Sequence, residues 1–309
     1  MRRVMVLGAL LLAGTLSVVG VAGQQGQMNI EVEQIKDNLF VLRGAGGGGN
    51  TAVFVTTTGV VVVDSKNPGW GQPILDAIET LTSNPVTTLI NTHSHGDHVS
   101  GNVAFPTTVE IVTHETTKAN MEAMRTYTNR TEPPVNVFKD SSGQGLPTRT
   151  FTDRMSLGSG ADQVDLYYFG RGHTGGDAWV VFPSVRALHA GDIFLGKRVP
   201  FLDAANGGSG VDIGDSVQRA HDTIRNIDTI ITGHSTQQMT WNDLAEWAEF
   251  NRDFFEVVRS GHAAGRTVDE IATSWTMPAK YVGYDGSNVA GVRSNVQVIV
   301  DELEGRSAR

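Results

Sequence analysis

One loop constrains this chain more than any other segment: NTHSHGDH, residues 91–98, which places three imidazoles and one carboxylate within six positions. The β-branched run VTTLI before it, residues 86–90, predicts a buried strand. Because a strand alternates its side chains between two faces, only a loop at its end can aim all four polar groups at one point. Ser94 and Gly96 are small enough for such a tight loop. Nitrogen and oxygen ligands at this density suit a transition metal, zinc above all.

Three later segments repeat the arrangement of a ligand-type residue beside glycine at the end of a predicted strand. They are GHTGGD (172–177), AGD (190–192) and TGHS (232–235), and they contribute His173, Asp192 and His234. Glycine lets the backbone pass close to a metal. A single Gly-His pair would be weak support, whereas four such segments in one chain indicate a metal site at a sheet edge.

Strands and helices alternate over the rest of the chain. Strands are predicted at 30–32, 39–43, 51–57, 60–64, 109–113, 163–170, 178–182, 187–190 and 229–232, and helices around 73–81, 116–127, 215–226, 241–258 and 292–303. Two groups of strands, each mixed with helices, predict an α/β fold of sheets covered by helices. Residues 131–147 are rich in Pro, Gly and Ser and predict a surface excursion rather than a linker. The glycine run 44–49 lacks the Gly-Lys-Ser/Thr of a phosphate-binding loop.

The ordered series of these residues resembles the metallo-β-lactamase superfamily, over roughly residues 30 to 303. The resemblance implies a four-layer αββα sandwich of the α/β (α+β) class, with two zinc ions in a groove along one sheet edge. It also implies the ligands of each ion: His93, His95 and His173 for the first, Asp97, His98 and His234 for the second, and Asp192 bridging both. Ser235 stands where the family often has glycine.

The chemistry of these ligands agrees with a hydrolase. Six terminal ligands and one bridging carboxylate give each ion four protein contacts, and paired ions about 3.5–4 Å apart hold a nucleophile between them. Zinc lowers the pKa of bound water to about 7, so hydroxide exists at neutral pH. We expect a metal-bridging hydroxide to attack the carbonyl of an ester, thioester, lactone or amide, one ion polarising the carbonyl and the other stabilising the leaving group. Asp97 is the expected catalytic residue, which orients the hydroxide and relays a proton.

Asp192 bears on the substrate. The β-lactamases of the superfamily commonly have Cys or a non-bridging residue there, and some carry Lys three positions later, where this chain has Leu195. Asp192 resembles instead the branches that cleave thioesters, lactones and other esters. β-Lactam opening stays open as a main or side activity. A phosphodiesterase, a diiron oxidoreductase, a mononuclear iron dioxygenase and a non-catalytic metal-binding member rank lower. The segment from Asp192 through Pro200-Phe201-x-Asp203 to Ser209 resembles exported metallohydrolases.

A few residues outside the ligand series have competing interpretations. Asp64 ends a predicted strand and is either a hydrogen-bond acceptor for a ligand imidazole or a strand-end cap. Lys197 and Arg198 follow Asp192 closely and are either contacts for a substrate carboxylate or solvated loop cations. His189 is more easily explained as a packed histidine than as part of the groove.

The first 23 residues have the pattern of a secretory leader: Met1-Arg2-Arg3, an apolar stretch, then the small pair Ala22-Gly23. We therefore expect an exported, periplasmic or secreted protein whose residues 24–309 form a single hydrolase domain. The chain has no Cys, so no disulfide supports it, and its formal net charge of −9 argues against a nucleic-acid partner. The expected partner is a small-molecule substrate, with no membrane contact after leader cleavage. The sequence does not predict an oligomeric state.

Overall fold

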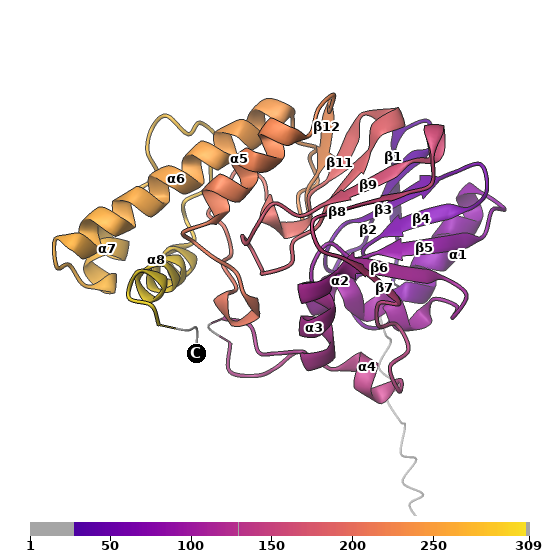
Figure 1. Cartoon of the computed structure of the whole chain (residues 1–309), viewed down its shortest axis with the longest axis horizontal. Coiled ribbons are helices and arrows are strands. Elements are labelled where there is room, and N and C mark those ends of the chain that lie inside the picture. The colour runs from indigo at the N-terminus through magenta and orange to yellow at the C-terminus, as the bar shows by residue number, and fades with distance from the viewer. Residues whose placement is uncertain (1–27, 129, 307–309) are drawn as a thin grey trace, which may run out of the picture.

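Two β-sheets packed face to face form the centre of this computed structural model, and helices cover their outer faces (Figure 1). The structure describes residues 28–128 and 130–306. The predicted leader at 1–23 lies outside the described residues.

The first sheet contains seven strands in sequential order. They are β1 (Glu31–Lys36), β2 (Leu39–Arg43), β3 (Thr51–Val55), β4 (Val60–Val63), β5 (Val86–Ile90), β6 (Glu110–His114) and β7 (Arg149–Phe151). Strands β1 to β4 are antiparallel, whereas β4, β5, β6 and β7 pair in parallel. Since parallel strands end at the same edge, the residues that follow β4 and β5 meet there.

The second sheet contains five strands in the spatial order β12-β11-β10-β9-β8. They are β8 (Arg154–Leu157), β9 (Val164–Tyr167), β10 (Trp179–Phe182), β11 (Ala187–His189) and β12 (Thr229–Ile231). Strand β10 is antiparallel to both β9 and β11, and β11 is parallel to β12. The carboxyl ends of β9, β11 and β12 therefore lie at one edge, which is where the segments with His173, Asp192 and His234 begin.

Strand periodicity explains why the sheets stack. In β4 all four valines are buried. Val61 and Val63 face the core between the sheets, whereas Val60 and Val62 face the core beneath the helix that follows. This is the two-residue alternation of a strand covered on both sides. Across the inter-sheet core the rings of Phe54 and Phe182 lie 5.1 Å apart.

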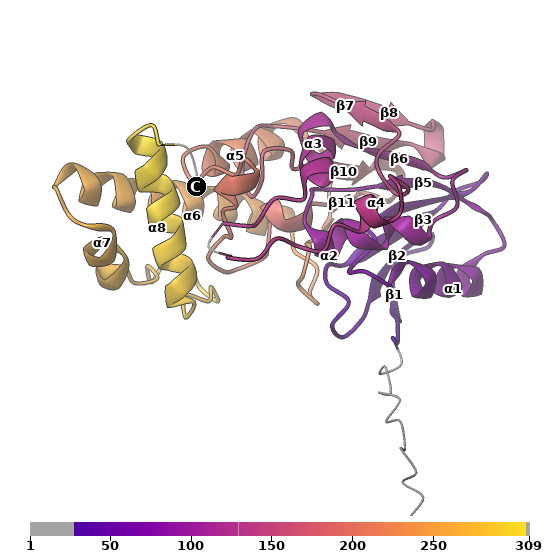
Figure 2. The ribbon, with the colours of Figure 1, turned by 90° about the horizontal axis from the view of Figure 1, so that it is seen from below.

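Helices form the outer layers. They are α1 (Gly71–Leu81), α2 (Gly96–Val99), α3 (Glu115–Ala123), α4 (Val137–Asp140), α5 (Ile213–Thr223), α6 (Trp241–Ala263), α7 (Val268–Ser274) and α8 (Val289–Leu303). Helix α1 covers the first sheet, and α5 to α8 pack in the core outside the second. Figure 2 shows α7 and α8 at the end of the molecule farthest from α1. The layered αββα fold is confirmed.

Some predicted boundaries differ from the observed ones. The helix predicted at 116–127 ends at Ala123, because Met124 adopts a left-handed conformation with φ of 42°. The helix predicted at 215–226 begins two residues earlier and ends at Thr223. The excursion at 131–147 contains the short helix α4, whose Phe138 packs into a small core beside α2 and α3. Among the described residues, no helix is long and apolar enough to cross a membrane.

Candidate metal centre

All seven predicted ligands converge at the edge where the strand ends meet. His93 and His95 lie in the loop after β5, and Asp97 and His98 lie on the single-turn helix α2 that continues it. His173 lies in the β9–β10 connection, and Asp192 and His234 follow β11 and β12. Their ligand atoms form two clusters, each with members within 4.8 Å of one another: His93, His95, His173 and Asp192 in the first, and Asp97, His98 and His234 in the second.

In the first cluster, hydrogen bonds on the far side of each ring decide which nitrogen faces inward. His95 donates through Nε2 to Asp203 at 2.7 Å, which leaves its Nδ1 only 3.0 Å from Nε2 of His173. His173 donates through Nδ1 to the carbonyl oxygen of Phe201 at 2.6 Å. His93 has Nδ1 beside Thr92, and its buried Nε2 has no hydrogen-bond partner. Three acceptor nitrogens therefore point at a common centre.

The second cluster is oriented in the same way. His98 donates through Nδ1 to Asp64 at 2.7 Å, so its Nε2 faces Nε2 of His234 at 3.2 Å. Oδ2 of Asp97 lies 3.3 Å from Nε2 of His234 and 3.7 Å from Nε2 of His98. Of the two interpretations of Asp64, the structure supports the hydrogen-bond acceptor for an imidazole of the cluster. Asp64 also accepts from the N–H and hydroxyl of Thr92, which ties the carboxylate to the start of the metal loop.

Asp192 lies between the two clusters. Its Oδ2 is 3.9 Å from Nε2 of His93 and 3.8 Å from Nε2 of His173, on the side of the first cluster. On the other side, the same oxygen is 3.2 Å from Nε2 of His234, and Oδ1 is 3.3 Å from Nε2 of His98. Oδ1 is buried without a hydrogen-bond partner. Orphaned buried polar atoms are costly in a protein, and a set of imidazole nitrogens with a carboxylate fits a zinc-type cation.

Electrostatics prepare the ligands for a cation. Burial, reinforced by neighbouring imidazoles, holds the pKa of His93 well below its usual range and lowers the pKa of His173 to about 4. Burial opposes ionisation of Asp97, but His98 and His234 outweigh it and lower the pKa of Asp97 to about 2. Burial likewise opposes protonation of His234, yet the carboxylates around it raise its pKa to about 9. His93 and His173 are thus neutral imidazoles, whereas a metal at the second cluster would displace a proton from His234.

Glycines allow the backbone to close around the ligands. A Cβ on Gly49 would lie 2.2 Å from Cε1 of His98, and a Cβ on Gly233 would lie 1.7 Å from Oδ1 of Asp192. The glycine run 44–49 therefore packs on the loop after β5, where the N–H of Gly49 donates to the carbonyl of Asp97 at 3.0 Å. Buried Lys66 donates from Nζ to the carbonyl of Gly49, which fixes the run from its other side.

Asp203 is a functional residue that the sequence did not single out. It is fully buried, accepts from Nε2 of His95, and also accepts from both the N–H and the hydroxyl of Thr128. The sequence pointed to Asp203 only through the segment Pro200-Phe201-x-Asp203, and the resemblance of that segment to exported metallohydrolases assigned no role to the residue.

A sequence profile of the metallo-β-lactamase superfamily matches residues 44–234, which include every predicted ligand. The chain belongs to the metallo-β-lactamase superfamily. The expectation of a metal-dependent hydrolase is confirmed at the level of this superfamily, and the His/Asp clusters described above could hold metal ions.

Similar proteins span more than one activity of the superfamily. A metallo-β-lactamase type 2 of Elizabethkingia meningoseptica is 28% identical over 251 residues, which cover 76% of this chain and 88% of the relative. A hydroxyacylglutathione hydrolase of Synechocystis sp. is 31% identical over 138 residues, or 43% of each chain.

Solved structures show the same fold. A metallo-β-lactamase from Pontibacter korlensis matches with a TM-score of 0.58 at 20% identity, over 72% of this chain and 99% of that one. The sec-alkylsulfatase Pisa1 from Pseudomonas sp. matches with a TM-score of 0.66 at 12% identity, over 89% of this chain and 50% of that one.

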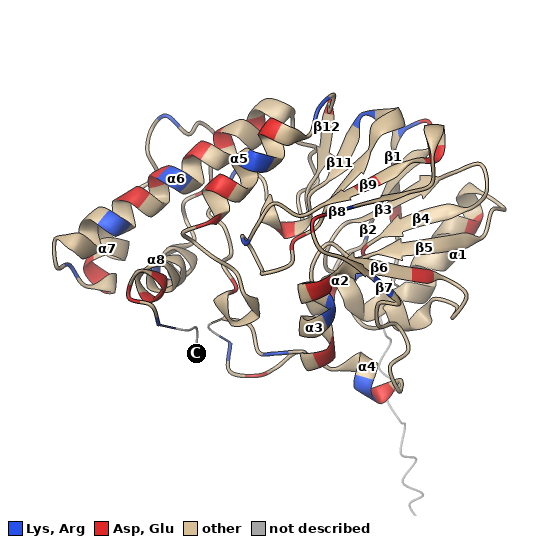
Figure 3. Ribbon diagram, in the orientation of Figure 1, with Lys and Arg blue, Asp and Glu red and all other residues tan. Residues whose placement is uncertain are grey.

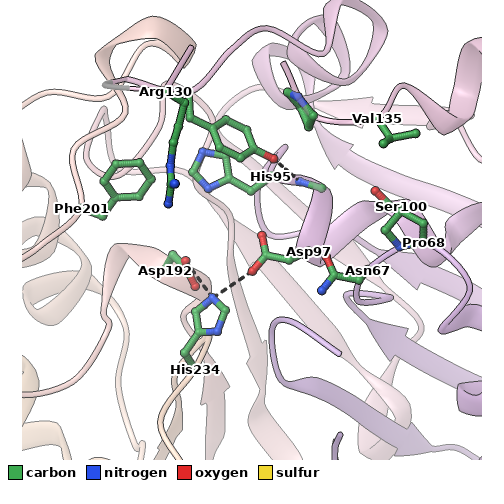
Figure 4. A pocket seen from close by; sticks show the side chains of 13 residues that line it. Asn67, Pro68, His95, Asp97, Ser100, Arg130, Val135, Asp192, Phe201 and His234 are labelled. Atoms are coloured by element: carbon green, nitrogen blue, oxygen red, sulfur yellow. Dashed lines mark hydrogen bonds and ion pairs between the residues drawn. The ribbon is translucent and has the colours of Figure 1, made fainter. Parts of the chain in front are cut away.

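An open pocket of about 480 Å³ gives access to the superfamily's metal clusters in this chain (Figure 4). Its floor contains His95, Asp97, Asp192 and His234, and its walls are Asn67, Pro68, Gly96, Ser100, Tyr127, Arg130, Pro134, Val135 and Phe201. Lys197 and Arg198 do not line it; Lys197 pairs instead with Asp243 at 3.0 Å and Glu246 at 3.3 Å. His189 is packed in the interior, as predicted.

Proposed function

We propose that this protein is a binuclear zinc hydrolase that cleaves the acyl bond of an ester, thioester, lactone or amide. The observation that carries the proposal is the position of Asp192 between two complete groups of inward-facing ligands. In this assignment one ion takes His93, His95 and His173, and the other takes Asp97, His98 and His234. Asp192 offers an oxygen to each.

When bound, the zinc pair supplies Lewis acidity and an activated water near neutral pH. The chain's own residues then prepare the reaction. Asp203 and Asp64 hold the rings of His95 and His98 in the tautomers that face inward. Asp97 lies on the pocket floor with about 30% of its side chain exposed, and its low pKa keeps it ionised. It is therefore the residue placed to accept a proton from the attacking water and pass it to the leaving group.

The relatives support two substrate classes. The match to a β-lactamase covers most of both chains and favours β-lactam opening as the alternative. The match to a hydroxyacylglutathione hydrolase, together with the carboxylate at position 192, favours acyl esters and thioesters. We place esters, thioesters and lactones first, because the Asp192 carboxylate lies within 4 Å of imidazoles of both clusters.

Metal analysis and a substrate screen test the proposal together. Purified full-length protein should contain about two zinc ions per chain, and a panel of esters, thioesters, lactones, β-lactams and phosphodiesters should identify the cleaved bond. Asp97→Asn should collapse turnover while some of the zinc stays bound. Asp76→Asn, an exposed change on α1, is the control and should be neutral. Unchanged turnover in Asp97→Asn, or cleavage of phosphodiesters alone, would contradict the assignment.

We also propose that the protein acts after export, on the basis of the leader-like segment at residues 1–23. Figure 3 shows Lys and Arg interspersed with Asp and Glu along α5 and α6. This supports a small-molecule rather than a nucleic-acid partner. N-terminal mass analysis of protein from the periplasmic fraction and the medium would test export, because an intact Met1 in the cytosolic fraction alone would contradict it.

A further inference from the structure

A short turn between α3 and α4 forms the wall of the pocket above the first metal cluster. The phenol oxygen of Tyr127 accepts from the N–H of Gly96 at 2.7 Å, and its ring centroid lies 4.3 Å from that of His95. The N–H and hydroxyl of Thr128 donate to Oδ1 of Asp203 at 2.8 and 2.9 Å. The N–H of Arg130 closes the turn on the carbonyl of Tyr127 at 3.0 Å.

Asp203 therefore holds a metal ligand and the pocket wall at once. Its Oδ2 accepts a hydrogen bond from His95, and its Oδ1 accepts one from the hydroxyl of Thr128. Since both carboxylate oxygens are engaged, Asp203 ties Thr128, two positions before Arg130, to His95 of the first cluster.

The exposed side chain of Arg130 lines the pocket and points in the direction of Asp192 (Figure 4). Within the described ranges, Arg130 is the only Lys or Arg that lines the pocket. No carboxylate of residues 28–128 or 130–306 forms an ion pair with it. The neighbouring arginine Arg125, in contrast, does not line the pocket.

The rest of the wall is mostly apolar. Phe201, Pro134, Val135 and Pro68 supply the apolar surface, and Asn67, Ser100 and Tyr127 are the uncharged polar side chains of the wall. A guanidinium that lines such a pocket can recognise an oxyanion through two parallel hydrogen bonds.

We propose that the substrate carries an anionic oxygen group, such as a carboxylate, close to the bond that is hydrolysed, and that Arg130 binds it. The inference rests on the proposed hydrolase function and deepens it. Apolar parts of the same substrate pack on Phe201 and Val135. The competing explanation is that the carboxylates of Asp97 and Asp192 attract the guanidinium in the metal-free protein and that it binds no substrate group. Zinc neutralises that attraction, so the zinc-loaded protein distinguishes the two explanations.

A pair of chromogenic esters that differ in one charge provides the kinetic test. The neutral member is 4-nitrophenyl butyrate, and the charged member is mono-4-nitrophenyl glutarate. The ratio of kcat/KM for the charged ester to that for the neutral one should fall roughly tenfold or more in Arg130→Gln, because a hydrogen bond to a charged group is lost. Arg130→Lys should retain part of the ratio. Arg125→Gln, the matched control, should keep the wild-type ratio.

Calorimetry gives a readout without turnover. Butyrohydroxamic acid and succinic monohydroxamic acid share a metal-binding end, and only the second adds a carboxylate. Zinc-loaded wild type should bind the charged compound more tightly, and Arg130→Gln should abolish the difference while Arg125→Gln preserves it. Equal binding of the two compounds by wild type would overturn the inference, and so would an unchanged ester ratio in Arg130→Gln.

The two proposals fail in different ways. If both esters are cleaved but the ratio of their kcat/KM values is the same in wild type and Arg130→Gln, the anion-site proposal is wrong and the hydrolase proposal stands. If zinc-loaded wild type cleaves neither ester nor any other acyl substrate and binds neither hydroxamate, the hydrolase proposal is wrong and the anion site falls with it.

Discussion

Replacing Asp203 with Asn should weaken zinc binding although the substituted residue touches no metal. The carboxylate accepts four hydrogen bonds: one from His95, two from Thr128 and one from Asn206 at 2.7 Å. An Asn side chain has one acceptor oxygen, and whichever way it turns, its NH2 faces two of these donors. If the NH2 faces Nε2 of His95, the ring must change tautomer and protonate Nδ1, the nitrogen that faces the first cluster.

The size of the effect follows from these contacts. Loss of such an outer partner lowers metal affinity about 10- to 100-fold, which corresponds to ~1.4–2.7 kcal/mol of binding free energy. The metal-free protein also loses hydrogen bonds from donors that stay buried, so its free energy of unfolding should fall by roughly 2–4 kcal/mol. The low pKa of Asp203, about 2, has the same origin: burial opposes ionisation, but the hydrogen bond from His95 outweighs it.

Competition with a chromophoric chelator measures the zinc affinity, and urea unfolding of metal-free protein measures the stability. Asp212→Asn is the control, because Asp212 lies in the same region of the chain, is about 40% exposed and pairs with Arg171. It should bind zinc like wild type. If Asp203→Asn unfolds at a lower urea concentration but holds both ions with wild-type affinity, the ring of His95 is not oriented by Asp203 and the reasoning is refuted.

Three further substitutions test other contacts. Gly49→Ala places a Cβ 2.2 Å from Cε1 of His98 and should lower the zinc affinity and the Tm. The fall in Tm should correspond to about 1–3 kcal/mol of unfolding free energy. Unchanged values would show that the backbone of residues 44–50 can shift without cost. Tyr127→Phe leaves the N–H of Gly96 without its phenol acceptor and should cost about 1–3 kcal/mol in urea unfolding; a cost near zero would mean that water replaces the phenol. Burial is the main cause that lowers the pKa of Lys66 from 10.5 to about 8, so the unfolded chain holds this proton to a higher pH than the folded one. The stability of metal-free wild type relative to Lys66→Met should therefore rise by ~3 kcal/mol between pH 8 and 10.5, and a difference that stays flat or falls over this range would contradict it.

The ligand set could be predicted from the sequence because local patterns mark the ends of strands. The predicted ligands come after predicted strands, in short segments that contain glycine, so their position relative to a sheet edge follows from the strands themselves. Asp64 was accessible by the same logic, since it directly follows the four valines of β4. The sheet pairing then brings these ends together.

The residues that orient the ligands and shape the pocket lacked such a mark. Asp203 contacts His95 across 108 positions of sequence, and it follows no strand. Tyr127 and Arg130 lie beyond the point where α3 ends, in a stretch predicted as helix and then excursion. Their roles arise from tertiary hydrogen bonds, and a single sequence carries no periodicity that reports such contacts.

The double use of Asp203 has a consequence for engineering the enzyme. Tyr127, Arg130, Pro134 and Val135 of the pocket wall belong to one excursion between α3 and β7, whereas the proposed metal ligands lie on segments attached to strand ends. The first part of the excursion is therefore an exchangeable module, and libraries that vary residues 130–135 avoid Phe138, which packs beside α2. A transplanted loop should begin after Tyr127 and Thr128, because these two residues keep their hydrogen bonds to Gly96 and Asp203 and so hold the start of the loop in place beside the clusters. New specificities should be reached by loop exchange at this junction more readily than by changing the sheets.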